Sequence, residues 1–120
     1  MTGSANSNAR ILAGECFCGA VRYAVVDSFQ YALNCHCSNC RRTAGAAFKP
    51  FAGIARDKLG ITGGDDNVMT YGDGAFVHVA MGTLVDAPSI RPTAHIFVGS
   101  KAPWFSITDD LPQYEGHITR

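Results

Sequence analysis

The sequence predicts a mostly β protein, because glycine and proline divide it into short segments that strand-forming residues fill. The 120 residues include 13 glycines and 5 prolines, and the runs between them are rich in Val, Ile, Phe and Tyr. Branched and aromatic side chains suit a pleated sheet, whereas glycine and proline suit the turns that close each strand. Helix signals are scarce by comparison. We therefore expect short strands, with short helical turns between some of them.

Length and composition indicate one folded domain. A chain of 120 residues can bury a core but is too short for two domains of ordinary size. Hydrophobic residues make up 47% and charged residues 17%, a balance typical of globular rather than disordered chains.

The clearest strand pattern runs from Val21 to Val25, where Val21, Tyr23 and Val25 share one face and Arg22 lies on the other. Further runs close at a glycine, a proline or a polar cluster, and each predicts a strand. These runs are Phe29 to Cys35, Ala46 to Ile54, Leu59 to Thr62, Ala75 to Leu84 and His95 to Gly99. The segment from Gly63 to Gly74 is expected to form turns around a short strand.

One short helical turn is predicted after these first strands. Ser38 is a suitable N-cap, the turn would continue through Thr43, and Gly45 would end it.

Charge and hydropathy narrow the classes of partner. Ten basic and ten acidic residues balance, so no long-range field favours a polyanion, and we expect no nucleic-acid partner. Arg41 and Arg42 could still form a local basic patch. Glycines and charges interrupt every hydrophobic run before the roughly 20 residues of a membrane-spanning helix. The first nine residues, MTGSANSNA, lack the features of a signal peptide, so a cytoplasmic location is expected.

All five cysteines lie between positions 16 and 40, as Cys16-Phe17-Cys18 and Cys35-His36-Cys37-Ser38-Asn39-Cys40. A disulfide framework is disfavoured by the odd count and the reducing location. A redox pair at Cys37 and Cys40 would leave the other three unexplained. Buried, chemically inert thiols are a further alternative. Zinc accounts for the clustering best, because it takes four thiolates in a closed site or three plus an exchangeable ligand in an open one.

Several separated motifs give the chain a family resemblance. They are Gly14-Glu15-Cys16-Phe17-Cys18-Gly19-Ala20-Val21-Arg22-Tyr23, the Cys35–Cys40 segment with Arg41-Arg42, Gly45-Ala46-Ala47-Phe48, and the later His95-Ile96-Phe97-Val98, Lys101-Ala102-Pro103-Trp104-Phe105 and Asp109-Asp110-Leu111-Pro112. Together they resemble the signature of the glutathione-dependent formaldehyde-activating enzyme family, which centromere protein V shares.

The resemblance implies a tent-like, mostly β zinc domain over residues 11–120, after a flexible segment at residues 1–10. It also implies a carbon-sulfur lyase activity that joins formaldehyde to glutathione as S-hydroxymethylglutathione. In this family pattern Cys16 and Cys18 meet a later Cys-x-x-Cys-Gly pair at a structural zinc. Cys35, Cys37 and Cys40 hold a second, open zinc.

The sequence departs from that pattern after Gly64, where no second cysteine pair follows. Cys16 and Cys18 alone cannot complete a four-thiolate site. They could share a metal with the Cys35, Cys37 and Cys40 triplet, recruit His78 or Asp73, or stay metal-free.

An open zinc at Cys35, Cys37 and Cys40 would activate a thiol such as glutathione, and these three are the predicted catalytic residues. His36, Arg41 and Arg42 are candidates to stabilise charge on the aldehyde oxygen. The two arginines could instead hold the carboxylates of the thiol, which is the role we predict for them, or remain solvated. His36 is expected to point away from the metal, hydrogen-bonded at the surface.

The remaining polar and aromatic residues have structural explanations. His95 is expected in the core or at its rim, Trp104 and Phe105 over the sheet, and Asp109 and Asp110 in a turn. A non-catalytic, zinc-stabilised binding domain is the main alternative to an enzyme. Exposed strand edges would also allow a homodimer.

Overall fold

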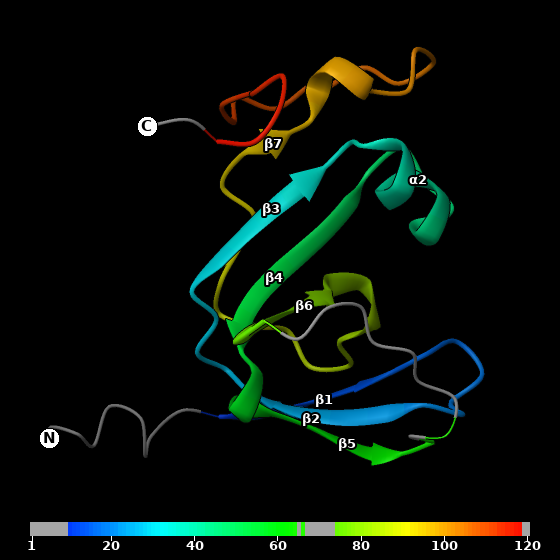
Figure 1. Ribbon diagram of the computed structural model, residues 1–120, viewed down its shortest axis with the longest axis vertical. Coiled ribbons are helices and arrows are strands. Elements are labelled where there is room, and N and C mark those ends of the chain that lie inside the picture. The colour runs from blue at the N-terminus through cyan, green and yellow to red at the C-terminus, as the bar shows by residue number, and fades with distance from the viewer. Residues whose placement is uncertain (1–9, 65, 67–73, 119–120) are drawn as a thin grey trace, which may run out of the picture.

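The computed structural model describes residues 10–64, 66 and 74–118, and these residues form two β-sheets (Figure 1). The sheets lie one above the other in this view, the smaller below, so the molecule has two halves. A mostly β, tent-like fold with short helical turns is therefore confirmed. Within the described part of the chain, no helix is long and apolar enough to cross a membrane.

The smaller sheet contains β1 (Ile11–Glu15), β2 (Arg22–Val26) and β5 (Leu59–Gly63), in the order β1-β2-β5. Both pairings are antiparallel, and β1 faces β2 across a tight turn that contains the first two cysteines. The sequence prediction did not include β1 as a strand. Its alternating pattern becomes clear only from burial, since Leu12 and Gly14 face inward while their neighbours are exposed.

The larger sheet has the order β6-β4-β3-β7. Its strands are β3 (Tyr31–Cys35), β4 (Lys49–Ala55), β6 (Phe76–Ala80) and β7 (His95–Ile96). The β3–β4 and β4–β6 pairs are antiparallel, whereas β7 runs parallel to β3.

The two sheets share a core of buried aliphatic side chains. Leu12 and Val25 come from the smaller sheet, and Ile54 and Val79 come from the larger one. Tyr23 packs against this core, so the predicted apolar face of the Val21–Val25 segment is confirmed at Tyr23 and Val25. Burying such side chains contributes roughly 1.5–3 kcal/mol each, which holds the two halves together.

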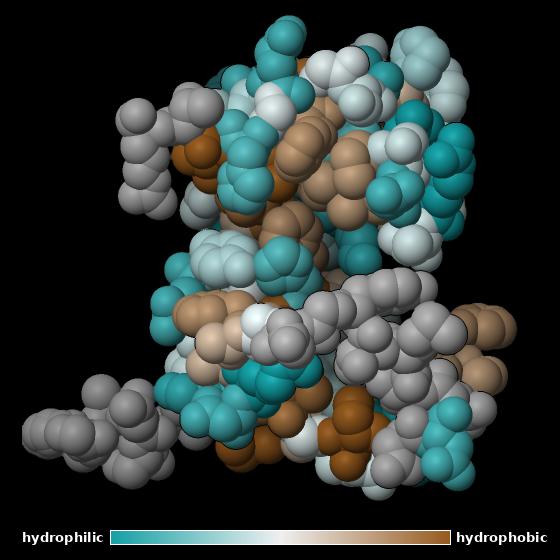
Figure 2. All heavy atoms as spheres, in the orientation of Figure 1, coloured by the Kyte–Doolittle hydropathy of each residue, from teal (hydrophilic) through white to brown (hydrophobic). Residues whose placement is uncertain are grey.

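A second core lies around β3, β4 and β7. It contains Leu33, Cys35, Phe51, Ala94 and Ile96, and Cys37, Cys40, Phe97, Tyr114 and Ile118 pack against it. The last residues of the described chain thus cover this end of the larger sheet, as Figure 1 shows for the segment beside β7. In the space-filling view, apolar side chains reach the surface over the middle of this half (Figure 2).

The predicted strands lie at the right positions, but several of them are too long, whereas Leu59–Thr62 is one residue shorter than β5. The run from Ala75 ends as a strand at Ala80 and turns into the 3-10 helix η3 (Met81–Thr83). The run from His95 ends at Ile96, because Phe97 adopts a left-handed conformation with φ of 56° before the 3-10 helix η4 (Val98–Ser100). A third 3-10 helix, η1 (Arg56–Lys58), joins β4 to β5. Most of the predicted Gly63–Gly74 turns lie outside the described residues.

The predicted helical turn is present as α2 (Ser38–Ala44), but its N-cap is Cys37 rather than Ser38. Gly45 ends the helix in a left-handed conformation with φ of 61°, as the sequence indicates. A thiol replaces the expected hydroxyl because the Cys37 Sγ accepts from the Cys40 backbone N–H at 3.4 Å. The helix start is therefore built from two of the candidate metal ligands.

The expectation that Trp104 packs over a sheet is wrong. Its side chain is 71% exposed, since the Pro103–Trp104 turn directs it to solvent. Phe105 is half-buried, with its ring 5.5 Å from that of Phe48.

Candidate metal centre

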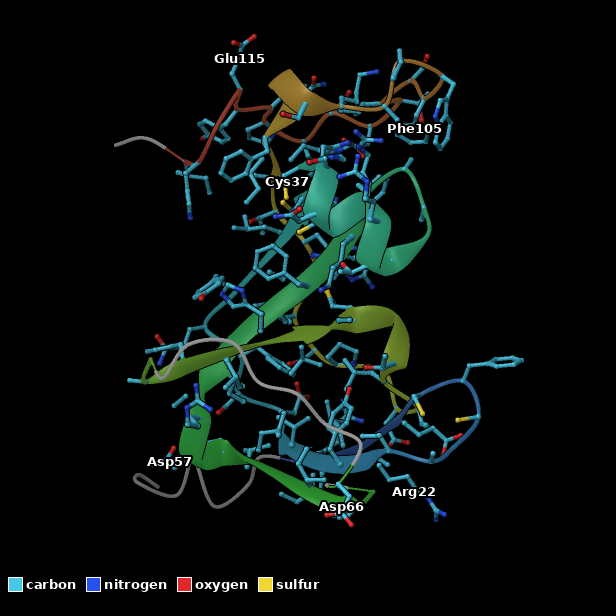
Figure 3. The ribbon with its side chains drawn as sticks, turned by 45° about the vertical axis from the view of Figure 1, so that its right-hand side comes forward. Arg22, Cys37, Asp57, Asp66, Phe105 and Glu115 are labelled. Carbon is cyan, nitrogen blue, oxygen red and sulfur yellow. The ribbon has the colours of Figure 1, made fainter. Side chains whose placement is uncertain are left out.

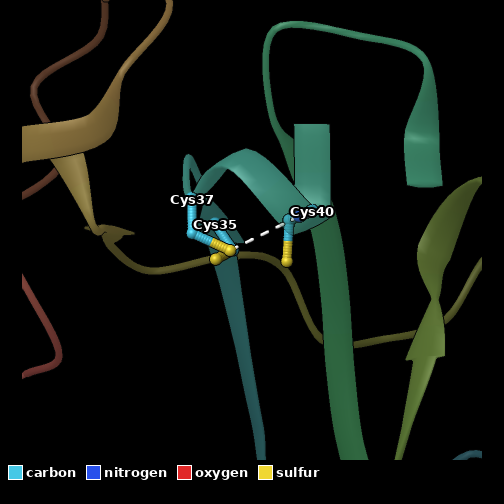
Figure 4. A group of neighbouring side chains, drawn as sticks. All are labelled: Cys35, Cys37 and Cys40. Atoms are coloured by element: carbon cyan, nitrogen blue, oxygen red, sulfur yellow. Dashed lines mark hydrogen bonds between the residues drawn. The ribbon is translucent and has the colours of Figure 1, made fainter. Parts of the chain in front are cut away.

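Three of the five cysteines converge at the junction of β3 and α2. Cys35 ends β3, Cys37 caps α2, and Cys40 lies in the first turn of the helix. Their sulfur atoms all lie within 4.8 Å of one another, and Figure 4 shows the side chains gathered on one side of the helix start. The dashed line in that view is the hydrogen bond from the Cys40 backbone to Cys37. The sequence prediction of one thiol cluster here is confirmed as a possible metal site.

The donor set suits zinc. Tetrahedral zinc with Zn–S bonds of about 2.3 Å separates its sulfur ligands by about 3.8 Å, which lies within the spread of the three sulfurs. Soft thiolate donors select zinc, copper(I) or iron–sulfur groups over the hard cations calcium and magnesium. Three protein ligands would leave one position for a further ligand.

The three thiols differ in how readily they ionise. Burial raises the pKa of Cys35. Burial, followed by contacts with the other two sulfurs, raises the pKa of Cys40 to about 12. Burial also opposes ionisation of Cys37, but hydrogen bonds from the Cys40 backbone and the neighbouring thiols outweigh it and lower the pKa of Cys37. A divalent cation would offset the repulsion among three thiolates, so metal uptake must release protons.

Cys16 and Cys18 lie in the turn between β1 and β2, on the smaller sheet. Their sulfur atoms are 3.6 Å apart, and the Cys16 Sγ accepts from the Val21 backbone N–H at 3.3 Å. These two contacts lower the pKa of Cys16. Figure 3 shows Arg22, which follows this turn, at the opposite end of the molecule from Cys37.

The structure therefore does not bring the two cysteine groups together. Within the described residues, the triplet forms the one group of three or more potential metal ligands, and it does not include Cys16 or Cys18. The described structure does not support the alternative in which Cys16 and Cys18 share one metal with members of the triplet. His78 lies on β6 beside the triplet, so it does not serve the Cys16–Cys18 pair, and Asp73 lies outside the described residues.

The expectation that His36 is hydrogen-bonded at the surface is also wrong. His36 is fully buried, and its Nε2 lies 2.8 Å from Nδ1 of His95, which is buried as well. His95 in turn places Nε2 3.0 Å from a carboxylate oxygen of Asp109. Asp109 thus anchors a buried histidine pair in addition to forming the predicted turn, where it accepts from the Leu111 backbone.

Hydrogen bonds link the two imidazoles and the Asp109 carboxylate in one chain. The hydrogen bond from His95 lowers the pKa of Asp109, so the carboxylate accepts from His95 Nε2–H. Nδ1 of His95 and Nε2 of His36 share the remaining hydrogen bond, at 2.8 Å. Burial, the nearby His95 and the cations Lys101 and Arg41 lower the pKa of His36 to about 4, so His36 is neutral at pH 7 and one of its ring nitrogens is a hydrogen-bond acceptor. The buried Nδ1 of His36 has no hydrogen-bond partner among the described residues.

Arg41 and Arg42 lie in the last turn of α2. Arg41 is partly buried and its Nε has no partner among the described residues, whereas Arg42 is exposed. Neither lines the cavity beside the triplet. Their predicted role in binding a thiol stays a prediction.

A cavity of about 250 Å³ opens beside the triplet, and its lining contains residues that the sequence prediction did not assign to the site. The lining residues are Cys35, Cys40, Lys49, Phe51, His78, Ile96, Phe97 and His117. Strand register accounts for several of them, since Lys49 pairs with Cys35 and Phe51 with Leu33. The sequence predicted a strand within Ala46–Ile54, but it did not predict the partner of that strand.

The fold and the thiol cluster define a small β protein with a candidate zinc centre. Comparison with known proteins makes this assignment specific. A family model described as glutathione-dependent formaldehyde-activating enzyme matches residues 11–75, more than half of the chain. The chain belongs to this family, and the resemblance drawn from the cysteine motifs is confirmed.

A curated relative comes from Halomonas elongata and is named "Putative glutathione-dependent formaldehyde-activating enzyme". It is 40% identical over 63 residues, which cover 52% of this chain and 35% of the relative. The chain thus aligns with about a third of that protein's length. The later motifs, from His95 onward, lie beyond the residues matched by the family model.

Proposed function

We propose that this protein is a zinc-dependent enzyme of carbon-sulfur chemistry that joins glutathione to formaldehyde. The observation that carries the proposal is the convergence of Cys35, Cys37 and Cys40 beside a cavity. Family membership supplies the two substrates. A cytoplasmic location suits the proposal, because free thiols persist in a reducing compartment.

In this proposal the three cysteines would bind zinc as thiolates and neutralise its charge. Zinc bound there would lower the pKa of an incoming thiol, so that a thiolate is available at neutral pH. Cys37 contributes a sulfur that α2 holds in place through the Cys40 backbone. Cys35 is fixed by its pairing with Lys49 and Ile96 on the neighbouring strands.

The reaction is an addition that needs no further reactant. The sulfur of glutathione forms a bond to the carbonyl carbon, the π bond of formaldehyde opens, and the thiol proton ends on the new hydroxyl oxygen. The reverse reaction breaks the same carbon-sulfur bond, which is the lyase direction.

The cavity would orient the thiol for this step. Phe51, Ile96 and Phe97 give it an apolar wall, and Cys35 and Cys40 form the end nearest the candidate metal position. Apolar walls exclude water and strengthen electrostatic interactions with the reacting atoms. Holding the sulfur and the carbonyl carbon in contact contributes to the rate by removing translational freedom.

The test is a titration of the zinc-loaded protein with glutathione, followed by formaldehyde, with the product observed by NMR. We expect heat on adding glutathione and faster formation of S-hydroxymethylglutathione than in buffer alone. Cys37→Ser, incubated with the same amount of zinc, should lose both. If zinc binds but millimolar glutathione gives no heat, the enzyme proposal fails.

A zinc-stabilised binding domain is the second candidate. It is favoured by the Cys16–Cys18 pair, which lacks the later cysteine pair of the family pattern, and by the partial coverage of the curated relative. One zinc saturated by four protein ligands, with no turnover, would support it over the enzyme.

A further inference from the structure

The cavity beside the thiol cluster is lined by a lysine and two histidines that have no role in the proposed reaction. Lys49, His78 and His117 line it together with Cys35 and Cys40. Among the described residues no acidic side chain lines the cavity, and Lys49 forms no ion pair. An unpaired cation beside a candidate thiolate site points to an anionic ligand.

Strand register explains why these side chains meet. Lys49 is paired with Cys35 across β3 and β4, so their Cα atoms are about 5 Å apart and both side chains lie on one face. Gly53 pairs with both Tyr31 and His78, which extends the same face to β6. His117 approaches from the C-terminal segment. The arrangement follows from the sheet and does not depend on a single flexible loop.

His78 is held firmly at this face. Its Nε2 lies 2.8 Å from the Tyr31 hydroxyl, and its ring lies 4.5 Å from that of Phe51. Burial, followed by the nearby Lys49 and His117, lowers the pKa of His78. His78 therefore serves best as a neutral hydrogen-bonding wall, and Lys49 supplies the full charge.

The size of the cavity selects part of a ligand. Its volume of about 250 Å³ is below the roughly 300–1,000 Å³ typical of small-molecule sites. A cavity of this size suits the thiol-bearing part of glutathione and one carboxylate, with the rest of the tripeptide outside it. The glycine carboxylate is the nearer of the two to the sulfur along the covalent chain.

We propose that Lys49 binds the glycine carboxylate of glutathione when the sulfur of glutathione lies at the Cys35, Cys37 and Cys40 cluster, with His78 and His117 forming the walls of this subsite. The inference rests on the proposed function, since it takes glutathione as the ligand. It gives the role predicted for Arg41 and Arg42 to a residue on β4. Lys49 is a binding residue here and takes no part in bond formation.

The experiment compares glutathione with its glycine monoethyl ester, which keeps the thiol but lacks that carboxylate. Both are titrated calorimetrically into zinc-loaded wild type, Lys49→Gln and Lys49→Arg. Lys58→Gln is the matched control, because Lys58 lies in η1 with its amine on Ser28 and outside the cavity. Zinc content is measured for every variant.

We expect Lys49→Gln to weaken glutathione binding roughly tenfold, the lower end for a hydrogen bond to a charged group, and to leave ester binding nearly unchanged. Wild type should prefer glutathione over the ester by a similar factor, and Lys49→Arg should retain most of that preference. Lys58→Gln should match wild type with both ligands.

Two results would overturn the inference while leaving the proposed function intact. One is wild type binding both ligands equally well. The other is Lys49→Gln weakening both ligands to the same extent, which would show that Lys49 acts through the charge of the thiol cluster. Absence of binding by either thiol to the zinc-loaded wild type would overturn the proposed function and this inference together.

Discussion

The two cysteine groups have similar spacing along the chain but different surroundings. Cys16 and Cys18 sit in a turn of the smaller sheet, where Cys18 is exposed and Phe17 between them is fully exposed. Cys35, Cys37 and Cys40 sit where a buried strand meets a helix start, beside a second core and a cavity. The difference shows that convergence of at least three donors, more than thiol density in the sequence, marks the candidate centre.

The surroundings also differ in polarity. The turn at Cys16 offers a backbone hydrogen-bond donor to the sulfur, and Phe17 and Cys18 in it are exposed to solvent. The triplet has apolar walls, a buried histidine pair and Lys49 within one small region. A site that activates a thiol needs both metal ligands and a place for the rest of the bound molecule, and the triplet combines three candidate ligands with a cavity.

The largest effect is expected on zinc content when a cysteine of the triplet is replaced. Cys37→Ser should weaken zinc binding by at least roughly 100-fold, more than the loss of an outer-shell partner usually costs, because two thiolates cannot hold the ion. Cys35→Ser and Cys40→Ser should behave alike. Metal analysis after dialysis against a weak chelator measures this, and unchanged zinc in all three variants would exclude the triplet as the metal site.

A smaller effect is expected on the stability of the half that holds the triplet. His95→Leu replaces the imidazole with an apolar side chain of similar size and leaves the buried His36 Nε2 without its hydrogen-bond partner. An unsatisfied buried polar atom costs about 1–3 kcal/mol of unfolding free energy, measurable by urea denaturation of the zinc-loaded protein. Asp109→Asn is the control and should cost less, because the Asp109 side chain is half-exposed. An unchanged urea midpoint for His95→Leu would mean that water satisfies His36.

Much of this half was predictable from local pattern. The thiol spacing identified the triplet, and Gly45 identified the end of α2, because both depend on neighbouring residues. The sequence did not place Lys49, His78 and His117 at this site, and it offered His78 only as a partner for Cys16 and Cys18. These residues reach the cavity through strand pairing and the C-terminal segment. Nothing near Lys49 in the sequence indicates that Cys35 lies opposite it.

The histidine pair shows the same limit. An alternation of His36 with two ligands predicts only that it points away from them, which is as consistent with the surface as with the core. The chain segment that buries it runs through His95 and Asp109, about 60 and 70 residues later. Burial of His36 is a tertiary property, and the sequence contains no local signal for it.

A pH-dependent contribution to stability is expected at Asp27, which directly follows β2 of the smaller sheet. Burial opposes ionisation of Asp27, but hydrogen bonds from Ser89 and Arg10 outweigh it and lower its pKa. Its contribution to stability is therefore present above the unfolded pKa of about 3.9 and is lost as pH falls through the lower folded value. Asp27→Asn should cost about 1–2 kcal/mol at pH 7 by urea denaturation, and the difference from wild type should close below about pH 4. A constant difference across this range would show that the charge of Asp27 is not responsible.

The smallest effect is expected at the first cysteine pair, because few contacts support its predicted structural role. The Cys16 Sγ accepts one backbone hydrogen bond from Val21, which a serine hydroxyl can also accept, and Cys18 contacts only Cys16 among the hydrogen-bonding groups described. We expect Cys16→Ser and Cys18→Ser to retain zinc at the triplet.

Surface substitutions of this kind usually change the unfolding free energy by no more than about 0.5 kcal/mol, and Cys16→Ser should cost more than Cys18→Ser. Thermal unfolding beside metal analysis measures both, with Cys37→Ser as the positive control for metal loss. If Cys16→Ser releases zinc while the unfolding midpoint stays constant, Cys16 belongs to the primary metal site, and the division between the two cysteine groups is wrong.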